Sequence, residues 1–224
     1  MMLTFPIRCH SGLRPTITQH YGEVGNLEWY RSKGIEIPRH NGTDIIIGDP
    51  KQTYGSALIV PGDGWRMVKE TFDEPLSTKG NGVTIQSPSF IEDGMEKVLQ
   101  AVYWHCSEVV QAHGELSAGT VVGYVGNSGA VRPEPSPACP YCGSHLHLML
   151  FEFRRVGSKW VKWYTDNGLD GAIDPMSRFS LDNLEHGQDS DVSKDNPPLV
   201  WAMGKIGLDS AWQKIVYLYK LFIK

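Results

Sequence analysis

Two histidine-containing motifs, about one hundred residues apart, carry the residue types of a hydrolytic metal centre. The first, His40-Asn41-Gly42-Thr43-Asp44, places an imidazole and a carboxylate four residues apart. The second, His145-Leu146-His147, lies in a strand-like run. Because residues two apart in a strand face the same side, both of its imidazoles are expected to project toward one site. One of them can then bind a metal while its neighbour transfers protons.

A hydrolytic zinc centre uses three protein ligands and leaves one position for water. One carboxylate and two neutral imidazoles, from His40, Asp44 and His147, supply that set and leave the ion positively charged. His105, at the end of the strand-like run 99–105, is expected to join His145 in proton transfer or oxyanion stabilisation. We therefore predict one catalytic Zn²⁺, with His105 and His145 as the catalytic residues.

The segments that must position these residues have the pattern of short β-strands separated by Gly, Pro, Asn and Asp clusters. Only one short helix is indicated before them, near residues 27–31. No repeat and no alternation of strands with long helices is visible, which argues against a doubly wound nucleotide-binding fold. The predicted fold class is mainly β, with an antiparallel core. The candidate strands are 57–60, 66–71, 83–86, 99–105, 120–125 and 146–153.

Length and composition indicate one principal globular domain with appendages: 224 residues, 41% hydrophobic and 21% charged. A net charge of −4 argues against binding to nucleic acid or anionic lipid. No apolar run approaches the roughly 20 residues that span a bilayer, so we expect no transmembrane segment. The first residues lack a charged leader followed by an apolar stretch, so we also expect no secretion signal.

Four parts are expected along the chain. An N-terminal extension (1–14) precedes the main domain (15–181). Residues 182–204 form an acidic, proline-containing linker. In residues 205–224 apolar side chains recur at helical spacing, which predicts an amphipathic helix that packs on the domain or docks to a protein partner.

In combination, these motifs resemble the lysostaphin-like peptidoglycan metalloendopeptidases of the LytM type, the M23 family. The resemblance covers about residues 15–180. His40-Asn41-Gly42-Thr43-Asp44 is similar to the family's H-x-G-x-D motif, and residues 145–152 are similar to its H-L-H-F-E motif. The other similar pieces are Ile17-Thr18-Gln19-His20-Tyr21-Gly22, Tyr103-Trp104-His105, the glycine-rich stretch 114–129 and Ile173-Asp174-Pro175.

The resemblance implies an antiparallel β core with a metal cleft, zinc bound by His40, Asp44 and His147, and catalytic roles for His105 and His145. It further implies an endopeptidase that hydrolyses peptide cross-links of bacterial peptidoglycan at the cell wall, in an extracellular, periplasmic or phage-delivered setting. Without a visible secretion signal, a phage lysin or tail-associated hydrolase is the expected context, and a bacterial remodelling enzyme is the alternative. From a different class, the alternative is a non-catalytic wall-binding or phage structural module that retains the fold.

Three segments, 69–81, 87–96 and 130–144, look like enlarged loops, and loops around a cleft usually set specificity. The last contains Cys139-Pro140-Tyr141-Cys142, for which a disulfide, a second metal site and free thiols all stay open. With His113-Gly114-Glu115 this pair loosely imitates a zinc-deaminase signature, but that interpretation leaves both histidine motifs unexplained. The other two cysteines are Cys9 and Cys106, and four cysteines are too few for a disulfide scaffold.

Overall fold

The computed structural model describes residues 2–10, 12–25, 27–34, 39–71, 79–165, 167–181 and 186–187. The chain divides into two compact units, Met1–Val192 and Ser193–Lys224. The predicted C-terminal helix, 205–224, and nearly all of the predicted linker, 182–204, lie outside the described residues. The four predicted domain boundaries therefore stay predictions. No helix in the described ranges is long and apolar enough to cross a membrane.

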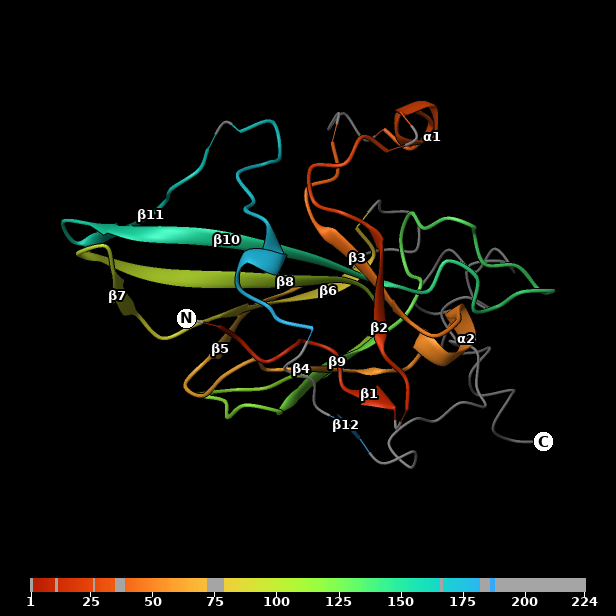
Figure 1. Cartoon of the computed structure of the whole chain (residues 1–224), viewed down its shortest axis with the longest axis horizontal. Helices are drawn as coiled ribbons and strands as arrows, with labels where there is room; N and C mark the ends of the chain where they lie inside the picture. The colour runs from red at the N-terminus through yellow and green to blue at the C-terminus, as the bar shows by residue number, and fades with distance from the viewer. Residues whose placement is uncertain are drawn as a thin grey trace, which may run out of the picture. The chain divides into compact units, whose positions relative to one another are not determined.

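One antiparallel sheet dominates the described part of the chain (Figure 1). Its main path runs, in spatial order, through β2 (Pro15–Gln19), β3 (Thr43–Ile47), β10 (Leu146–Val156), β8 (Met95–Val109), β6 (Asn81–Gln86) and β5 (Arg66–Thr71). Off this path, β11 (Lys159–Lys162) pairs with β10, β7 (Phe90–Glu92) and β9 (Val121–Val125) pair with β8, and β4 (Ala57–Ile59) pairs with β9. The predicted mainly β, antiparallel fold class is confirmed.

The remaining elements are short. They are α1 (Leu27–Ser32), α2 (Pro50–Thr53), the 3-10 helix η1 (Pro175–Ser177) and a parallel pair of two-residue strands, β1 (Cys9–His10) and β12 (His186–Gly187). The α2 helix begins at a capping box, because the Asp49 carboxylate accepts from the Gln52 amide and the Gln52 side chain accepts from the Asp49 amide. The six candidate strands and the short helix near 27–31 all correspond to elements of the structure.

The two faces of β10 pack into two apolar clusters. Leu146, Leu148 and Leu150 point into the main core, while Met149 and Phe151 join a smaller cluster on the opposite face. The first residues of the chain also belong to the main core, since Phe5 and Ile7 are fully buried. Burial of each such side chain contributes about 1.5–3 kcal/mol. Both layers therefore hold β10, and with it the second histidine motif, in a fixed place.

Candidate metal centre

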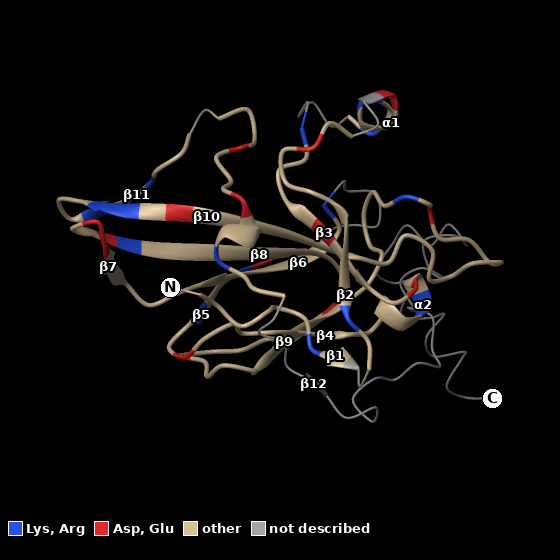
Figure 2. Ribbon diagram, in the orientation of Figure 1, with Lys and Arg blue, Asp and Glu red and all other residues tan. Residues whose placement is uncertain are grey.

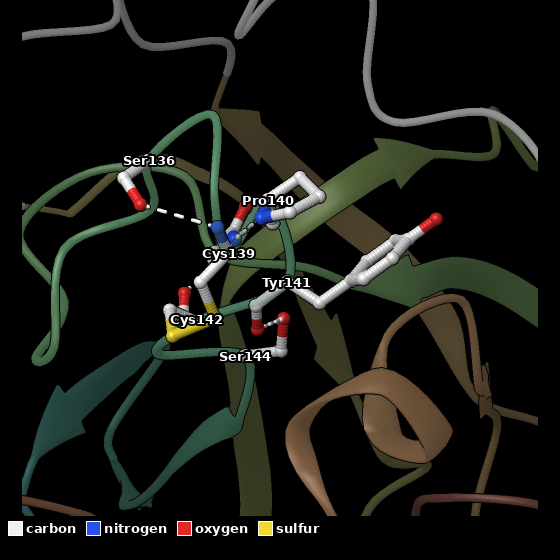
Figure 3. The surroundings of a disulfide bond; sticks show 7 residues. Ser136, Cys139, Pro140, Tyr141, Cys142 and Ser144 are labelled. Atoms are coloured by element: carbon white, nitrogen blue, oxygen red, sulfur yellow. Dashed lines mark hydrogen bonds between the residues drawn. A yellow bond between two sulfur atoms is a disulfide. The ribbon is translucent and has the colours of Figure 1, made fainter.

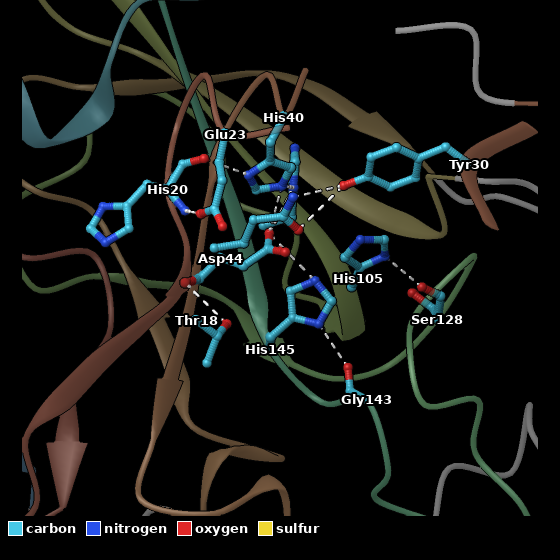
Figure 4. Close-up of polar contacts among 12 residues, drawn as sticks. Thr18, His20, Glu23, Tyr30, His40, Asp44, His105, Ser128, Gly143 and His145 are labelled. Carbon is cyan, nitrogen blue, oxygen red and sulfur yellow. Dashed lines mark hydrogen bonds and ion pairs between the residues drawn. The ribbon is translucent and has the colours of Figure 1, made fainter. Parts of the chain in front are cut away.

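The β3–β10 pairing brings the two histidine motifs together, because Asp44 lies opposite His147 in the antiparallel register. His40 comes from the turn that leads into β3. His147 Nδ1 lies 2.9 Å from Asp44 Oδ1 and 3.0 Å from His40 Nε2. His40 Nε2 lies 3.1 Å from the same carboxylate oxygen (Figure 4). Three ligand atoms thus form a nearly equilateral triangle.

The size and chemistry of this triangle fit a zinc ion. A tetrahedral site with ligands at about 2.0–2.1 Å has edges of about 3.3 Å, close to the observed 2.9–3.1 Å. Two imidazoles and one carboxylate are also the donors that zinc accepts. Gly42 is required here, since a Cβ would lie 2.7 Å from His147 Nε2 and 2.6 Å from the Leu148 carbonyl oxygen. The residues present therefore fit the ion that the sequence predicts.

Backbone carbonyls orient the imidazoles at this site. His40 Nδ1 lies 3.3 Å from the His20 carbonyl oxygen, and His145 Nδ1 lies 2.7 Å from that of Gly143. His105 Nδ1 lies 2.7 Å from the carbonyl oxygen of Ser128. Because a carbonyl only accepts, each Nδ1 carries the proton, and each Nε2 keeps a lone pair for a metal or a proton.

A β-bulge aims His105 at the same site. His105 has a φ of +64° and no partner on β6, where the register passes from Trp104 directly to Cys106. The extra residue resets the alternation, so Tyr103 and Cys106 are both fully buried in the core. The His105 ring centre then lies 4.7 Å from that of His145 and 5.9 Å from that of His147. Such strained residues concentrate at functional sites.

The electrostatics of the site favour an ionised Asp44 and neutral His147 and His105. Burial alone would raise the pKa of Asp44, but attraction to His145 and hydrogen bonds from His147 and His40 hold it well below its usual range. Burial is the main cause that lowers the pKa of His147 and, much further, that of His105. The lowered pKa values favour an ionised Asp44 beside a neutral His147, and a deprotonated carboxylate and a neutral imidazole are the ligand states that a divalent cation requires.

A cleft of about 820 Å³ opens over these residues. All five predicted site residues line it: His40, Asp44, His105, His145 and His147. The Trp104 ring stacks on His147, with 5.2 Å between ring centres. From α1, the Tyr30 hydroxyl donates to the side-chain oxygen of Gln19 at the cleft wall. The structure thus assembles the predicted set in one accessible place, while the metal-binding and catalytic roles stay predictions.

Several contributors to the site have no sequence signal of their own. The carbonyl groups of His20, Ser128 and Gly143 act through the backbone, so their residue types do not reveal them. Trp104 belongs to the recognised histidine strand and lies opposite His147 in the β8–β10 ladder, but the strand pattern does not predict the bulge at the next residue, which aims His105 at the site.

The cysteine pair left open by the sequence is a disulfide, Cys139–Cys142, in the loop before β10 (Figure 3). Sulfur atoms joined in this way do not act as thiolate ligands, so the second-metal and zinc-deaminase interpretations do not fit this structure. Cys9 and Cys106 are free and buried.

Comparison with known proteins gives matches among solved structures. No protein-family model matches the chain, and no curated protein does so either. A zinc-containing peptidase from Vibrio cholerae is 19% identical, with 71% of this chain and 39% of that chain covered and a TM-score of 0.42. A putative glycyl-glycine endopeptidase LytM from Ruminococcus gnavus is 19% identical, with 75% and 59% covered and a TM-score of 0.43.

A third solved structure is the catalytic domain of the prophage-encoded M23 protein EnpA from Enterococcus faecalis. It is 22% identical, with 69% of this chain and 92% of that chain covered and a TM-score of 0.39. Of these three solved structures, two are described as peptidases and the third as an M23 protein. The match spans less than two thirds of the length of the Vibrio and Ruminococcus proteins.

Proposed function

We propose that this chain is a zinc-dependent endopeptidase that hydrolyses peptide cross-links of bacterial peptidoglycan. The observation that carries the proposal is the convergence of His40 Nε2, Asp44 Oδ1 and His147 Nδ1 within 3.1 Å of one another. His105 and His145 stand beside that triangle in an open cleft. Three ligands plus separate proton-transfer groups are what metal-dependent peptide hydrolysis needs.

In the proposed reaction, His40, Asp44 and His147 hold the zinc ion, and His105 and His145 transfer protons. Zinc, when bound, supplies Lewis-acid polarisation of the peptide carbonyl and makes water more acidic. His145 presents Nε2 to the cleft, 3.5 Å from Asp44 Oδ1, while its Nδ1 is held by Gly143. The His105 ring lies beside that of His145, with 4.7 Å between ring centres, and its Nδ1 is held by Ser128. One imidazole takes the proton from the attacking water at its Nε2. The other, once it carries a proton at Nε2, donates to the oxyanion or protonates the leaving amine.

The cell wall is the proposed place of action, because the cross-linked substrate occurs there. Phage delivery, as a lysin or tail-associated hydrolase, stays the prediction made from the sequence.

Digestion of purified peptidoglycan tests the proposal. Soluble products are read by mass spectrometry for newly freed amino groups, with and without a chelator and with zinc added back. We expect chelator-sensitive cleavage that zinc restores. His145→Ala should abolish cleavage and keep its zinc, because His145 lies outside the ligand triangle.

The contrary result is a zinc-loaded protein that binds the wall but releases nothing from several cross-bridge types. It would favour the non-catalytic wall-binding module.

A further inference from the structure

Asn127 joins the two segments that orient the proposed catalytic histidines. Its side chain is 6% exposed. Its amide nitrogen donates to the Pro140 carbonyl oxygen at 2.9 Å and to the Cys142 carbonyl oxygen at 3.0 Å. Both donor hydrogens of this amide are therefore committed to the loop before β10.

Asn127 and Cys142 are each followed by a residue whose carbonyl oxygen accepts a hydrogen bond from one of the two proposed catalytic imidazoles. Ser128 follows Asn127 and accepts from His105 Nδ1 at 2.7 Å. Gly143 follows Cys142 and accepts from His145 Nδ1, also at 2.7 Å. Figure 4 shows the contacts of His105 with Ser128 and of His145 with Gly143. The Asn127 side chain connects the segments that carry these two carbonyl groups. Displacement of the loop would turn both rings together.

The disulfide fixes the loop on which Asn127 acts. Cys139 and Cys142 close a short turn, in which the Cys142 amide also donates to the Cys139 carbonyl oxygen at 3.2 Å. Cys139 exchanges two backbone hydrogen bonds with Ser136, each 3.0 Å long, and the Ser144 hydroxyl donates to the Tyr141 carbonyl (Figure 3). The two carbonyls that Asn127 binds belong to Pro140, between the two cysteines, and to Cys142 itself. The disulfide and the Asn127 side chain therefore restrain the same four residues of backbone.

Gly143 leaves little space for adjustment. It has a φ of +71°, and a Cβ at this position would lie 2.4 Å from the Pro133 carbonyl oxygen. The acceptor of His145 is therefore packed against the beginning of the same enlarged loop, 130–144. These contacts restrict the position of the Gly143 carbonyl and therefore that of the His145 ring. Precise placement matters, because a shift of about 1 Å in a catalytic group can lower the rate about 100-fold.

We propose that Asn127 and the Cys139–Cys142 disulfide form a positioning clamp for His105 and His145, so that the site reaches full activity only with the disulfide formed. The part of this inference that concerns kcat rests on the proposed function, whereas the part that concerns the position of the two imidazoles does not. Asn127, Cys139 and Cys142 are not among the residues that line the cleft, and they act through the two carbonyls. Loss of the clamp should lower kcat about 10- to 100-fold, with KM and zinc content nearly unchanged.

Reduction provides a test without mutation. A phosphine reductant and one water convert the disulfide to two thiols: the phosphine loses two electrons and takes the oxygen, and each sulfur gains one proton. Cys139 and Cys142 are partly exposed, whereas Cys9 and Cys106 are fully buried. Reduction should therefore lower kcat in the wild type and change nothing further in the Cys139→Ser/Cys142→Ser double variant, which starts at the lowered value.

The decisive readout is nuclear magnetic resonance of zinc-loaded protein labelled with ¹⁵N-histidine. His105→Ala and His145→Ala assign the two Nδ1–H signals that the 2.7 Å hydrogen bonds protect from exchange. We expect Asn127→Ala, Asn127→Asp and the reduced wild type each to shift or lose both signals. Asn167→Ala is the matched control, because Asn167 ties another loop through the Ala172 carbonyl and contacts neither histidine.

Unchanged Nδ1–H signals in the reduced wild type and in folded Asn127→Asp would overturn the clamp. Should Asn127→Ala fail to fold, these two samples still decide. If no form of the protein cleaves peptidoglycan while the signals respond as expected, the proposed function fails and the clamp stands. If the wild type cleaves but neither signals nor kcat respond to reduction or to Asn127→Asp, the clamp fails and the proposed function stands.

Discussion

The long strand pair β8–β10 ends in two polar clusters of opposite design. At one end, beside the Trp104–His147 pair, a single carboxylate, Asp44, is surrounded by imidazoles. At the other end, beside the Lys97–Arg154 pair, acidic and basic residues lie close together, as the red and blue segments of β7, β8 and β10 show in Figure 2. Lys97 Nζ donates to Glu92 at 2.9 Å and lies 3.8 Å from Glu152, and Arg178 binds Glu92 with two nitrogens.

The two clusters differ in the source of the positive charge that faces their carboxylates. At the end beside Lys97 and Arg154, here called the far end, the chain supplies this charge, since hydrogen bonds from Arg178 and Lys97 lower the pKa of Glu92 to about 2. The end beside Asp44 is called the site end. Burial alone would lower the pKa of Lys97, but its bond to Glu92 and the attraction of Glu152 raise it. At the site end no lysine or arginine bonds Asp44 among the described residues, and only imidazoles reach it. The cluster around Lys97 is closed by its own lysine and arginine, whereas the carboxylate of Asp44 has the neighbours that the proposed zinc ion needs.

Removing the carboxylate at the site end should have the largest effect. Asp44→Asn is expected to lower zinc affinity by more than the roughly 10- to 100-fold typical of outer-shell changes, because a ligand itself is lost. Peptidoglycan cleavage should fall with it. The matched control is Glu152→Gln at the far end of β10, which should keep zinc affinity unchanged. Competition with a chromophoric chelator measures both. Equal zinc affinity in Asp44→Asn and the wild type would contradict the proposed difference between the two ends.

Removing the cation at the far end should affect stability instead. Lys97 is 2% exposed. Lys97→Met removes the contacts with Glu92 and Glu152, but Arg154 still pairs with Glu152 at 2.6 Å. The expected cost in the free energy of unfolding is therefore about 1–3 kcal/mol, below that of a buried charge left with no partner. Urea denaturation of chelator-treated protein measures the loss. Zinc affinity of the folded variant should match that of the wild type, and a large fall in zinc affinity would show that the two ends are coupled.

Acid should weaken the far end in a defined pH window. Because the folded-state pKa of Glu92 is lowered from 4.5 to about 2, its contribution to stability is complete above about pH 4.5 and is lost as the pH falls toward 2. Chelator-treated wild type should lose stability over that window, and Glu92→Gln should lose less because it has no carboxylate to protonate. Urea midpoints at several pH values test this. Parallel curves for the two proteins would show that Glu92 does not carry the effect.

The sequence predicted the residue types of the site well because both motifs are local. His40 and Asp44 share one turn and strand entry, and the alternation of β10 alone places His145 and His147 on one side. The antiparallel strands with strong alternation or clear turns were also predictable. By contrast, β3 was missed because Ile45-Ile46-Ile47 is an apolar run without alternation, directly after the polar motif.

Other features depend on tertiary contacts that no local pattern encodes. The bulge at His105 arises where β6, β8 and β9 meet, so its φ of +64° cannot be inferred from the strand pattern. The carbonyl groups of Ser128 and Gly143 act regardless of side-chain type. The segment 1–14 was predicted as an extension, and the burial of Leu3, Phe5 and Ile7 in the main core follows from packing under the sheet.

The most direct test of the central claim is a crystal structure of the zinc-loaded protein with anomalous scattering recorded on both sides of the zinc absorption edge. The account predicts one anomalous peak inside the triangle of His40 Nε2, Asp44 Oδ1 and His147 Nδ1, and none at the Lys97 cluster or at Cys139 and Cys142. A zinc-replete crystal with no peak in that triangle, or with the ion bound elsewhere, would contradict it.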